Sequence, residues 1–234
     1  ASGVPAVNPQ ELSNVAWALA TARCADDRLL ASVGEAAAGA AELEPQQVSN
    51  ILWALARAQR GAGAEALAAI AAQRVGELQP QHLANVAWAA TRLALFEGEF
   101  LRRTLPRAAE LVVEFKPQEA CNLMWAFATV PAAEGGTAAA ALAAPLLRRM
   151  DTCNPQDHAN MIWALAKLSA ADAPRAAAVA TSALRRLHEF ELVQLSALVW
   201  ALARASHPSA ELFDRAAAQL EDRASTSRLG TQHV

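Results

Sequence analysis

Hydrophobic residues recur along most of the chain at intervals of three and four positions, the spacing typical of amphipathic α-helices. In the segment that begins at Pro9, one apolar face holds Leu12, Val15 and Leu19. A second face holds Trp17 beside small residues, which permit a neighbouring helix to come close. The rest of the helix surface is a strip made of Glu11, Asn14, Ala18 and Thr21.

The same pattern returns along the chain with a nearly constant period. The tryptophans are spaced 36, 35, 37, 38 and 37 residues apart, at Trp17, Trp53, Trp88, Trp125, Trp163 and Trp200. A Pro-Gln pair stands eight residues before the first five of them, with its proline at Pro9, Pro45, Pro80, Pro117 and Pro155. The last unit has Leu192-Val193 instead. A rare residue placed so regularly indicates an internal repeat of about 37 residues.

Each unit is predicted to fold as two helices. Proline suits the first turn of a helix, where its missing N–H needs no partner, so the first helix begins at Pro-Gln and continues through Trp-Ala-Leu-Ala. Breaks follow, for example at residues 60–63 and at Pro131. An alanine- and leucine-rich second helix comes next, and Pro106 and Pro145 are expected to kink two of these helices.

These units predict an all-α fold, a right-handed α-solenoid of six tandem helix hairpins. One hairpin cannot bury its apolar surface alone, and stacking on its neighbours does so. The predicted repeats are residues 8–43, 44–78, 79–115, 116–153, 154–190 and 191–223, which together form one domain over residues 8–223. Residues 1–7 are expected to be a frayed terminus, and residues 224–234, which show no period, a flexible tail.

Composition and motifs argue against several functional classes. The formal net charge is −3, so no overall attraction to nucleic acid or a membrane surface is expected. The three cysteines are scattered, and the five histidines form no pair at metal-ligand spacing. Phosphate-binding, metalloprotease and serine-hydrolase motifs do not occur. We therefore expect no enzyme, metal, cofactor or small-molecule substrate. No membrane span is expected, because Pro131, Gly135 and Gly136 break the most apolar segment.

The run Pro-Gln-Glu-Leu-Ser-Asn-Val-Ala-Trp-Ala-Leu-Ala, which begins at Pro9, resembles the octotricopeptide repeat family of algal and protist organelle proteins. It is also similar to the repeats that precede RAP domains and to those of FAST-kinase-like proteins. The resemblance covers residues 8–223. It implies binding of single-stranded organellar RNA in a concave groove, a role in RNA processing, stability or translation, a mitochondrial or chloroplast location, and protein subunits of a ribonucleoprotein complex as further partners. No RAP domain is visible, so no nuclease-like activity is expected.

Three columns of the polar strip are the candidate RNA contacts. The column six residues before each tryptophan is polar but variable, as base specificity requires: Glu11, Gln47, His82, Glu119, Asp157 and Gln194. The column three residues before it is asparagine in five units: Asn14, Asn50, Asn85, Asn122 and Asn160. The column four residues after it is cationic in four units, as phosphate contact requires: Arg57, Arg92, Lys167 and Arg204. The alanine that follows each tryptophan would leave room for a ligand.

Several of these residues also have a structural interpretation. The asparagines could form a ladder between helices, because buried amides need partners. The tryptophans are expected to be buried between repeats rather than to stack on bases. Arg148-Arg149 and Arg185-Arg186 would complement helix dipoles, and Asp157-His158 is interpreted as a surface pair. The alternative function is a protein-binding scaffold subunit of a large assembly such as an organellar ribosome.

Overall fold

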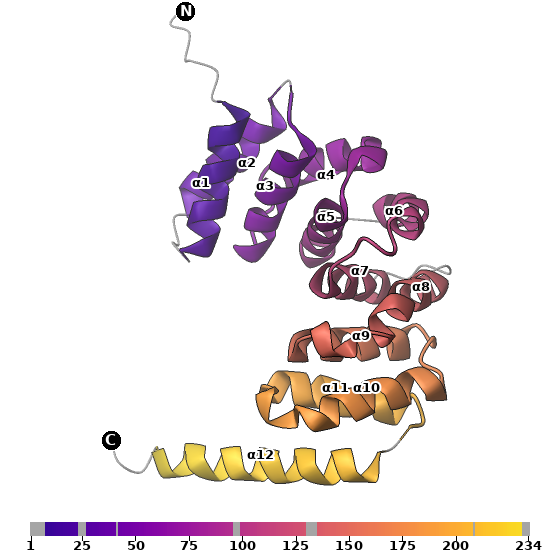
Figure 1. Cartoon of the computed structure of the whole chain (residues 1–234). Coiled ribbons are helices and arrows are strands. Elements are labelled where there is room, and N and C mark those ends of the chain that lie inside the picture. The colour runs from indigo at the N-terminus through magenta and orange to yellow at the C-terminus, as the bar shows by residue number, and fades with distance from the viewer. Residues whose placement is uncertain are drawn as a thin grey trace, which may run out of the picture.

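The computed structural model describes residues 8–22, 27–40, 42–95, 99–129, 135–207 and 209–230. All regular elements within these ranges are helical, which confirms the all-α prediction (Figure 1). The tryptophan-containing helices are α1 (Pro9–Thr21), α3 (Pro45–Arg57), α5 (Pro80–Arg92), α7 (Pro117–Thr129), α9 (Pro155–Lys167) and α11 (Leu192–Arg204). They alternate with α2 (Asp27–Ala38), α4 (Ala64–Gln73), α6 (Glu99–Glu110), α8 (Gly135–Leu147), α10 (Ala173–Arg185) and α12 (Ala210–Gly230). Short 3-10 helices are η1 (Val75–Glu77), η2 (Met150–Thr152) and η3 (Leu187–Glu189).

The odd-numbered helices start and stop for local reasons. Five of them begin with the proline of the Pro-Gln pair, as the sequence predicts. Four end with a residue in the left-handed region, with φ between 52° and 56°, at Gln59, Ala94, Ser169 and Ser206. At the end of α3 the Arg60 N–H then donates to the Leu55 carbonyl at 2.8 Å, which closes the last turn. In the second repeat the helix therefore ends with a turn at Gln59, just before the break predicted at residues 60–63.

The helices form two layers that follow a common arc. Each odd-numbered helix packs against the next odd-numbered helix and against the even-numbered helix that follows it. Successive even-numbered helices from α2 to α10 also contact one another. Figure 1 shows α5, α7, α9 and α11 along the inner side of the arc, with α4, α6 and α8 outside them. One face of every odd-numbered helix is therefore turned away from the even-numbered layer.

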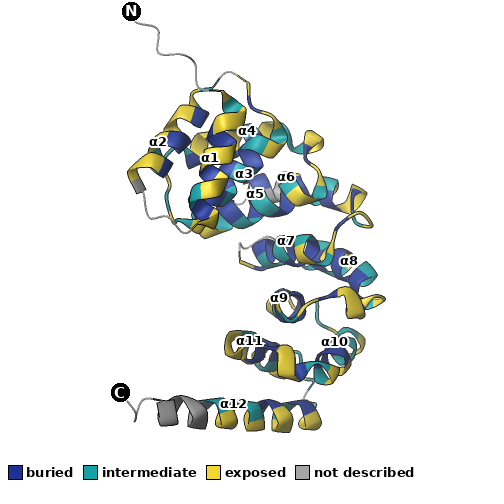
Figure 2. Cartoon of the chain, turned by 60° about the vertical axis from the view of Figure 1, so that its left-hand side comes forward, coloured by how far each residue is buried: buried dark blue, intermediate teal, exposed yellow. Residues whose placement is uncertain are grey.

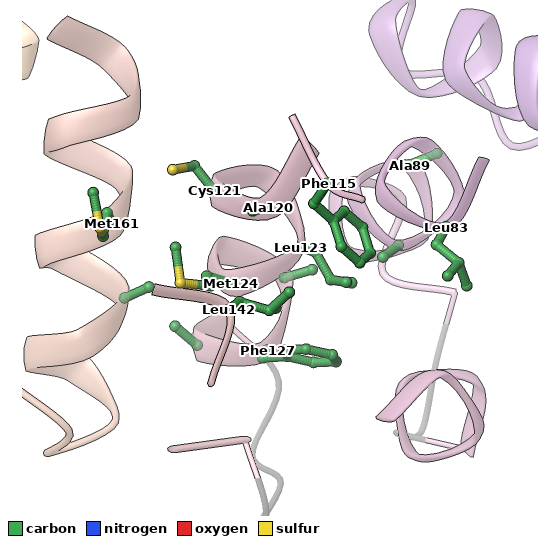
Figure 3. Close-up of a cluster of buried hydrophobic side chains, with 14 of the residues drawn as sticks. Leu83, Ala89, Phe115, Ala120, Cys121, Leu123, Met124, Phe127, Leu142 and Met161 are labelled. Atoms are coloured by element: carbon green, nitrogen blue, oxygen red, sulfur yellow. The ribbon is translucent and has the colours of Figure 1, made fainter. Parts of the chain in front are cut away.

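The core lies between these layers, as the dark blue positions of Figure 2 indicate. Figure 3 shows one part of it, where Phe115 lies between Leu83 of α5 and Leu123 of α7. The alanine after the tryptophan belongs to this core in five of the six helices, with no exposed surface at Ala54, Ala89, Ala126, Ala164 and Ala201. The expectation that these alanines line an open groove is wrong. Their small side chains instead let adjacent helices approach closely.

Arginines in or just after three even-numbered helices bond to the preceding unit. Arg107 Nε, Arg149 Nη2 and Arg186 Nη1 donate to the carbonyls of Leu78, Phe115 and Cys153 at 3.3, 2.9 and 2.8 Å respectively. Each acceptor lies just before an odd-numbered helix, at a residue whose buried carbonyl needs a partner. Arg149 and Arg186 therefore do more than complement a helix dipole.

The ends of the chain and the internal prolines differ in part from the prediction. Helix α12 continues to Gly230, so the start of the predicted flexible tail is helical. Residues 1–7, expected to be frayed, and residues 231–234 lie outside the described ranges. Pro106 and Pro145 lie inside α6 and α8, which both continue past them. None of the described helices is long and apolar enough to cross a membrane.

Candidate functional site

The exposed face of the odd-numbered helices bears a recurring set of side chains that we call the tryptophan strip. In α3 the set is Gln46, Asn50, Trp53 and Arg57, which are spaced by four, three and four residues. This spacing places all four on one side of a helix. The equivalent sets in the other helices are Gln10, Asn14, Trp17 and Thr21; Gln81, Asn85, Trp88 and Arg92; Gln118, Asn122, Trp125 and Thr129; Gln156, Asn160, Trp163 and Lys167; and Val193, Ala197, Trp200 and Arg204.

The expectation that the tryptophans are buried between repeats holds only in part, since Trp53, Trp88 and Trp163 pack against the core but keep some exposed surface. Trp17 and Trp200 are 52% and 44% exposed, and Trp53, Trp88, Trp125 and Trp163 are half-buried. The reason is geometric. Tryptophan and the alanine after it lie about 100° apart around the helix, and the contact between neighbouring helices takes the alanine side. The indole is left partly exposed on the open side, while those of Trp53, Trp88 and Trp163 also pack against the core.

Four of the six tryptophans have a cation stacked on the ring. The Arg57 and Arg92 guanidinium carbons lie 5.4 and 5.8 Å from the centroids of the Trp53 and Trp88 rings. Lys167 Nζ lies 5.2 Å from Trp163, and Arg204 lies 5.7 Å from Trp200. The rings of Trp163 and Trp200, on adjacent helices, are 6.4 Å apart. Thr21 and Thr129 replace the cation in α1 and α7. Such pairs hold the cation over an aromatic face while leaving its charge exposed.

The cationic column is not neutralised by carboxylates. No described acidic side chain forms an ion pair with Arg57, Arg92, Lys167 or Arg204. The even-numbered layer differs, because Arg107 and Arg186 pair there with Glu110 and Glu189. Arg57 Nε and Arg204 Nε each donate instead to a backbone carbonyl of the preceding odd-numbered helix, at Ala20 and Ala166, at 3.0 and 3.3 Å. These bonds fix the arginine stems and add no negative charge.

The variable column has a structural role at the helix N-termini. In five helices its side chain accepts the backbone N–H three residues earlier, completing half of a capping box; the acceptors are Gln47, His82, Glu119, Asp157 and Gln194. The column is also largely withdrawn from solvent, and Asp157 is only 3% exposed. It therefore does not form the open strip that the helix geometry alone predicts. Its role in base recognition stays a prediction.

The amide columns lie beside the tryptophans. Asn14 and Asn160 accept from the glutamines four residues earlier, Gln10 and Gln156, at 2.9 and 2.7 Å. Asn50 Nδ2 donates to Ser13 Oγ of the preceding helix at 3.4 Å, which agrees with the ladder interpretation at that position. The glutamine of each Pro-Gln pair is exposed, and sequence reasoning assigned it only to the first helical turn. The glutamine precedes the asparagine by four residues, and this spacing predicts that both side chains lie on the same face of the helix.

Asp157 and His158 are buried, not a surface pair. His158 lies between α9 and α10, with Nδ1 2.9 Å from the Asn154 carbonyl and Nε2 3.0 Å from Ser182 Oγ. Burial lowers the pKa of His158, and burial raises the pKa of the Asp157 carboxyl. The two side chains share no hydrogen bond and act in packing and capping.

The two cysteines among the described residues are withdrawn from solvent. Cys121 and Cys153 are free and buried, and burial raises the pKa of the Cys153 thiol to about 11, which disfavours the nucleophilic thiolate. Among the residues that the structure describes, no group of three metal-ligating side chains comes together. Comparisons of the chain with models of known protein families and with curated proteins find no match.

Proposed function

We propose that this chain is a right-handed α-solenoid of six tandem helix-hairpin repeats that binds single-stranded RNA on the tryptophan strip. The observation that carries the proposal is the pairing of partly exposed tryptophans with unneutralised cations. Arg57, Arg92, Lys167 and Arg204 each stack on a tryptophan of the same helix, and the helices lie side by side.

This combination suits a single strand. Bases of any kind stack on aromatic side chains, typically for about 1–3 kcal/mol per base, while cations beside them neutralise the backbone phosphates. The whole chain has a formal charge of −3, so attraction depends on where the charges lie. The strip places four cations that pair with no described carboxylate on the inner layer, whereas Arg107 and Arg186 of the outer layer are paired with glutamates.

The family resemblance of the repeats supports an organellar role. A protein of this class would act in mitochondrial or chloroplast RNA processing, stability or translation, with no catalysis of its own. The asparagine and glutamine columns would contact the bases, and the cationic column would contact phosphates.

The test is RNA affinity as a function of salt concentration. We compare the double variant Arg92→Gln/Lys167→Gln with the matched control Arg148→Gln/Arg185→Gln, which removes the same charge from exposed residues of the even-numbered layer. The side chains of Arg92 and Lys167 make no hydrogen bond to a described residue, so the fold should persist. The strip variant should bind more weakly, with a salt slope shallower by about 0.7 for each phosphate that it no longer neutralises. Equal slopes for the two variants would contradict the proposal.

The second candidate is a protein-binding scaffold, and one observation favours it. An apolar hollow of about 570 Å³ lies between α1 and α2, lined by Leu12, Val15 and Val33 among others. Val15 is 39% exposed, whereas Ile51 and Val86, at the same place in the next two repeats, are buried. This hollow would accept an amphipathic helix of an assembly partner. Loss of co-sedimentation with organellar ribosomes in Val15→Glu, but not in Arg92→Gln/Lys167→Gln, would favour the scaffold.

A further inference from the structure

A polar hollow interrupts the tryptophan strip near the middle of the molecule. It has a volume of about 360 Å³ and lies between the N-terminal halves of α5, α7 and α9. Its lining includes five carboxamides and two carboxylates, those of Gln81, Asn85, Gln118, Asn122, Asn154, Glu119 and Asp157. We call this hollow the amide pocket.

Four amides of this pocket differ from the corresponding amides of α1 and α9, whereas the fifth, Asn154, caps α9. In α1 and α9 the glutamine and asparagine bond to each other, at 2.9 Å for Gln10 and Asn14 and at 2.7 Å for Gln156 and Asn160. By contrast, Gln81, Asn85, Gln118 and Asn122 make no side-chain hydrogen bond to any other residue of the described ranges. Their donors and acceptors face an open volume.

The variable column explains this difference. Gln47 Nε2 donates to Gln10 of the preceding helix at 3.3 Å, and Gln194 Nε2 donates to Gln156 at 3.2 Å. A glutamine can do so because its oxygen completes the capping box while its NH₂ group remains available. In α7 and α9 the same position holds Glu119 and Asp157, and a carboxylate has no hydrogen to donate. The bridge to the preceding glutamine is therefore missing at the pocket.

We propose that the amide pocket binds a nucleobase that bears an exocyclic amino group. The inference rests on RNA binding by the tryptophan strip and adds a preference to it. The Glu119 carboxylate and the amide oxygens accept hydrogen bonds from the amino group of adenine, cytosine or guanine, and the amide NH₂ groups donate to a neighbouring ring nitrogen or carbonyl. Uracil presents carbonyl oxygens where these bases present an amino group, and these oxygens would face the carboxylates.

The charges on the strip set the orientation of the strand. Glu119 and Asp157 repel phosphate, and Arg92, beside Trp88, attracts it. The backbone therefore passes over the cation-bearing ends of the helices, and the base points toward their N-termini. Lys116 also lines the pocket and offsets part of the carboxylate charge.

The experiment measures the affinity of the whole chain for an all-uridine oligonucleotide and for versions with adenosine or cytidine at one scanned position. The wild-type chain should bind the best substituted oligonucleotide roughly tenfold more tightly than all-uridine RNA. The double variant Asn85→Ala/Asn122→Ala should lose this preference, and its affinity for all-uridine RNA should change no more than that of the matched control. The matched control is Asn14→Ala/Asn160→Ala, which removes amides that already have internal partners and should keep the preference.

A second variant tests the pocket without shortening any side chain that lines it. Glu119→Gln keeps an oxygen that can accept the capping hydrogen bond and gains an NH₂ group like those of Gln47 and Gln194. This NH₂ group should donate to Gln81 of the preceding helix. The variant should therefore lose the preference for bases with an amino group. A wild-type chain that binds all oligonucleotides equally, or a preference that survives both variants, overturns the pocket while RNA binding stands. Failure to bind any oligonucleotide overturns both.

Discussion

Lys167 Nζ lies 5.2 Å from the centroid of the Trp163 ring, one helical turn further along the same exposed face of α9. The same relationship recurs in α3, α5 and α11 with arginine as the cation. It gives the candidate site an aromatic surface and a positive charge in a single side-chain pair. The cation is exposed, whereas the rings of Trp53, Trp88 and Trp163 also pack against the core.

The first prediction concerns the aromatic part. Replacing Trp88 with alanine should weaken binding of single-stranded RNA by about 1–3 kcal/mol, because the strip then has one stacking surface fewer. Trp88→Phe, which retains an aromatic face, should bind nearly as the wild type does. Fluorescence anisotropy with a labelled oligonucleotide measures both. If Trp88→Ala folds and binds with unchanged affinity, the indole does not contact RNA.

The second prediction concerns a close approach between consecutive repeats. A Cβ on Gly34 would lie 2.2 Å from the Ala62 carbonyl oxygen, and Gly63, at φ +73°, lies against Gly34 on the other side. Gly34→Ala should lower the free energy of unfolding by about 1–3 kcal/mol, since backbone must move. Gly61→Ala is the control, because nothing lies within 4 Å of its added Cβ. Thermal or urea denaturation that ranks the two variants equally would contradict this.

The third prediction concerns helix ending. Ala94 holds the left-handed conformation at φ 53° with no functional contact, a state that costs a non-glycine residue about 1 kcal/mol. Ala94→Gly should therefore raise the free energy of unfolding by up to about 1 kcal/mol. Ala69→Gly, at an exposed position within α4, should lower it by about as much. A melting temperature that falls in both variants would show that the turn does not favour glycine.

The fourth prediction concerns pH. Burial lowers the pKa of His158, so between its folded pKa and the unfolded value of about 6.5 the unfolded chain binds more protons. Stability should therefore fall as the pH decreases below about 6.5. Burial also lowers the pKa of His82, which acts in the same direction, and raises the pKa of Asp157, which acts oppositely at lower pH.

The double variant His158→Leu/Ser182→Ala isolates this effect. Leucine occupies the equivalent position at Leu12, Leu83 and Leu195, and removing the serine hydroxyl avoids leaving a buried group without its partner. Urea denaturation at a series of pH values should show a shallower loss of stability in the variant. An identical profile for the double variant would exclude His158 as the cause.

The sequence alone determined the elements of this protein. Proline fixes where a helix starts, the three-and-four spacing of apolar residues makes the segment a helix, and the tryptophan period shows that the unit recurs. These signals are local, and each acts within a few turns of backbone. Five odd-numbered helices accordingly begin at the predicted proline, and all described elements are helical.

Only the tertiary structure decided which face of each helix is covered. Two faces of α3 can equally bury apolar side chains, and neighbouring helices cover the one with Ala54, which leaves Trp53 partly exposed. Packing then brought Gln47 within reach of Gln10 of another helix and left Gln81 without such a bridge, since Glu119 cannot donate a hydrogen. Contacts between residues about 37 positions apart depend on how closely backbones approach, and a helical period does not specify that distance.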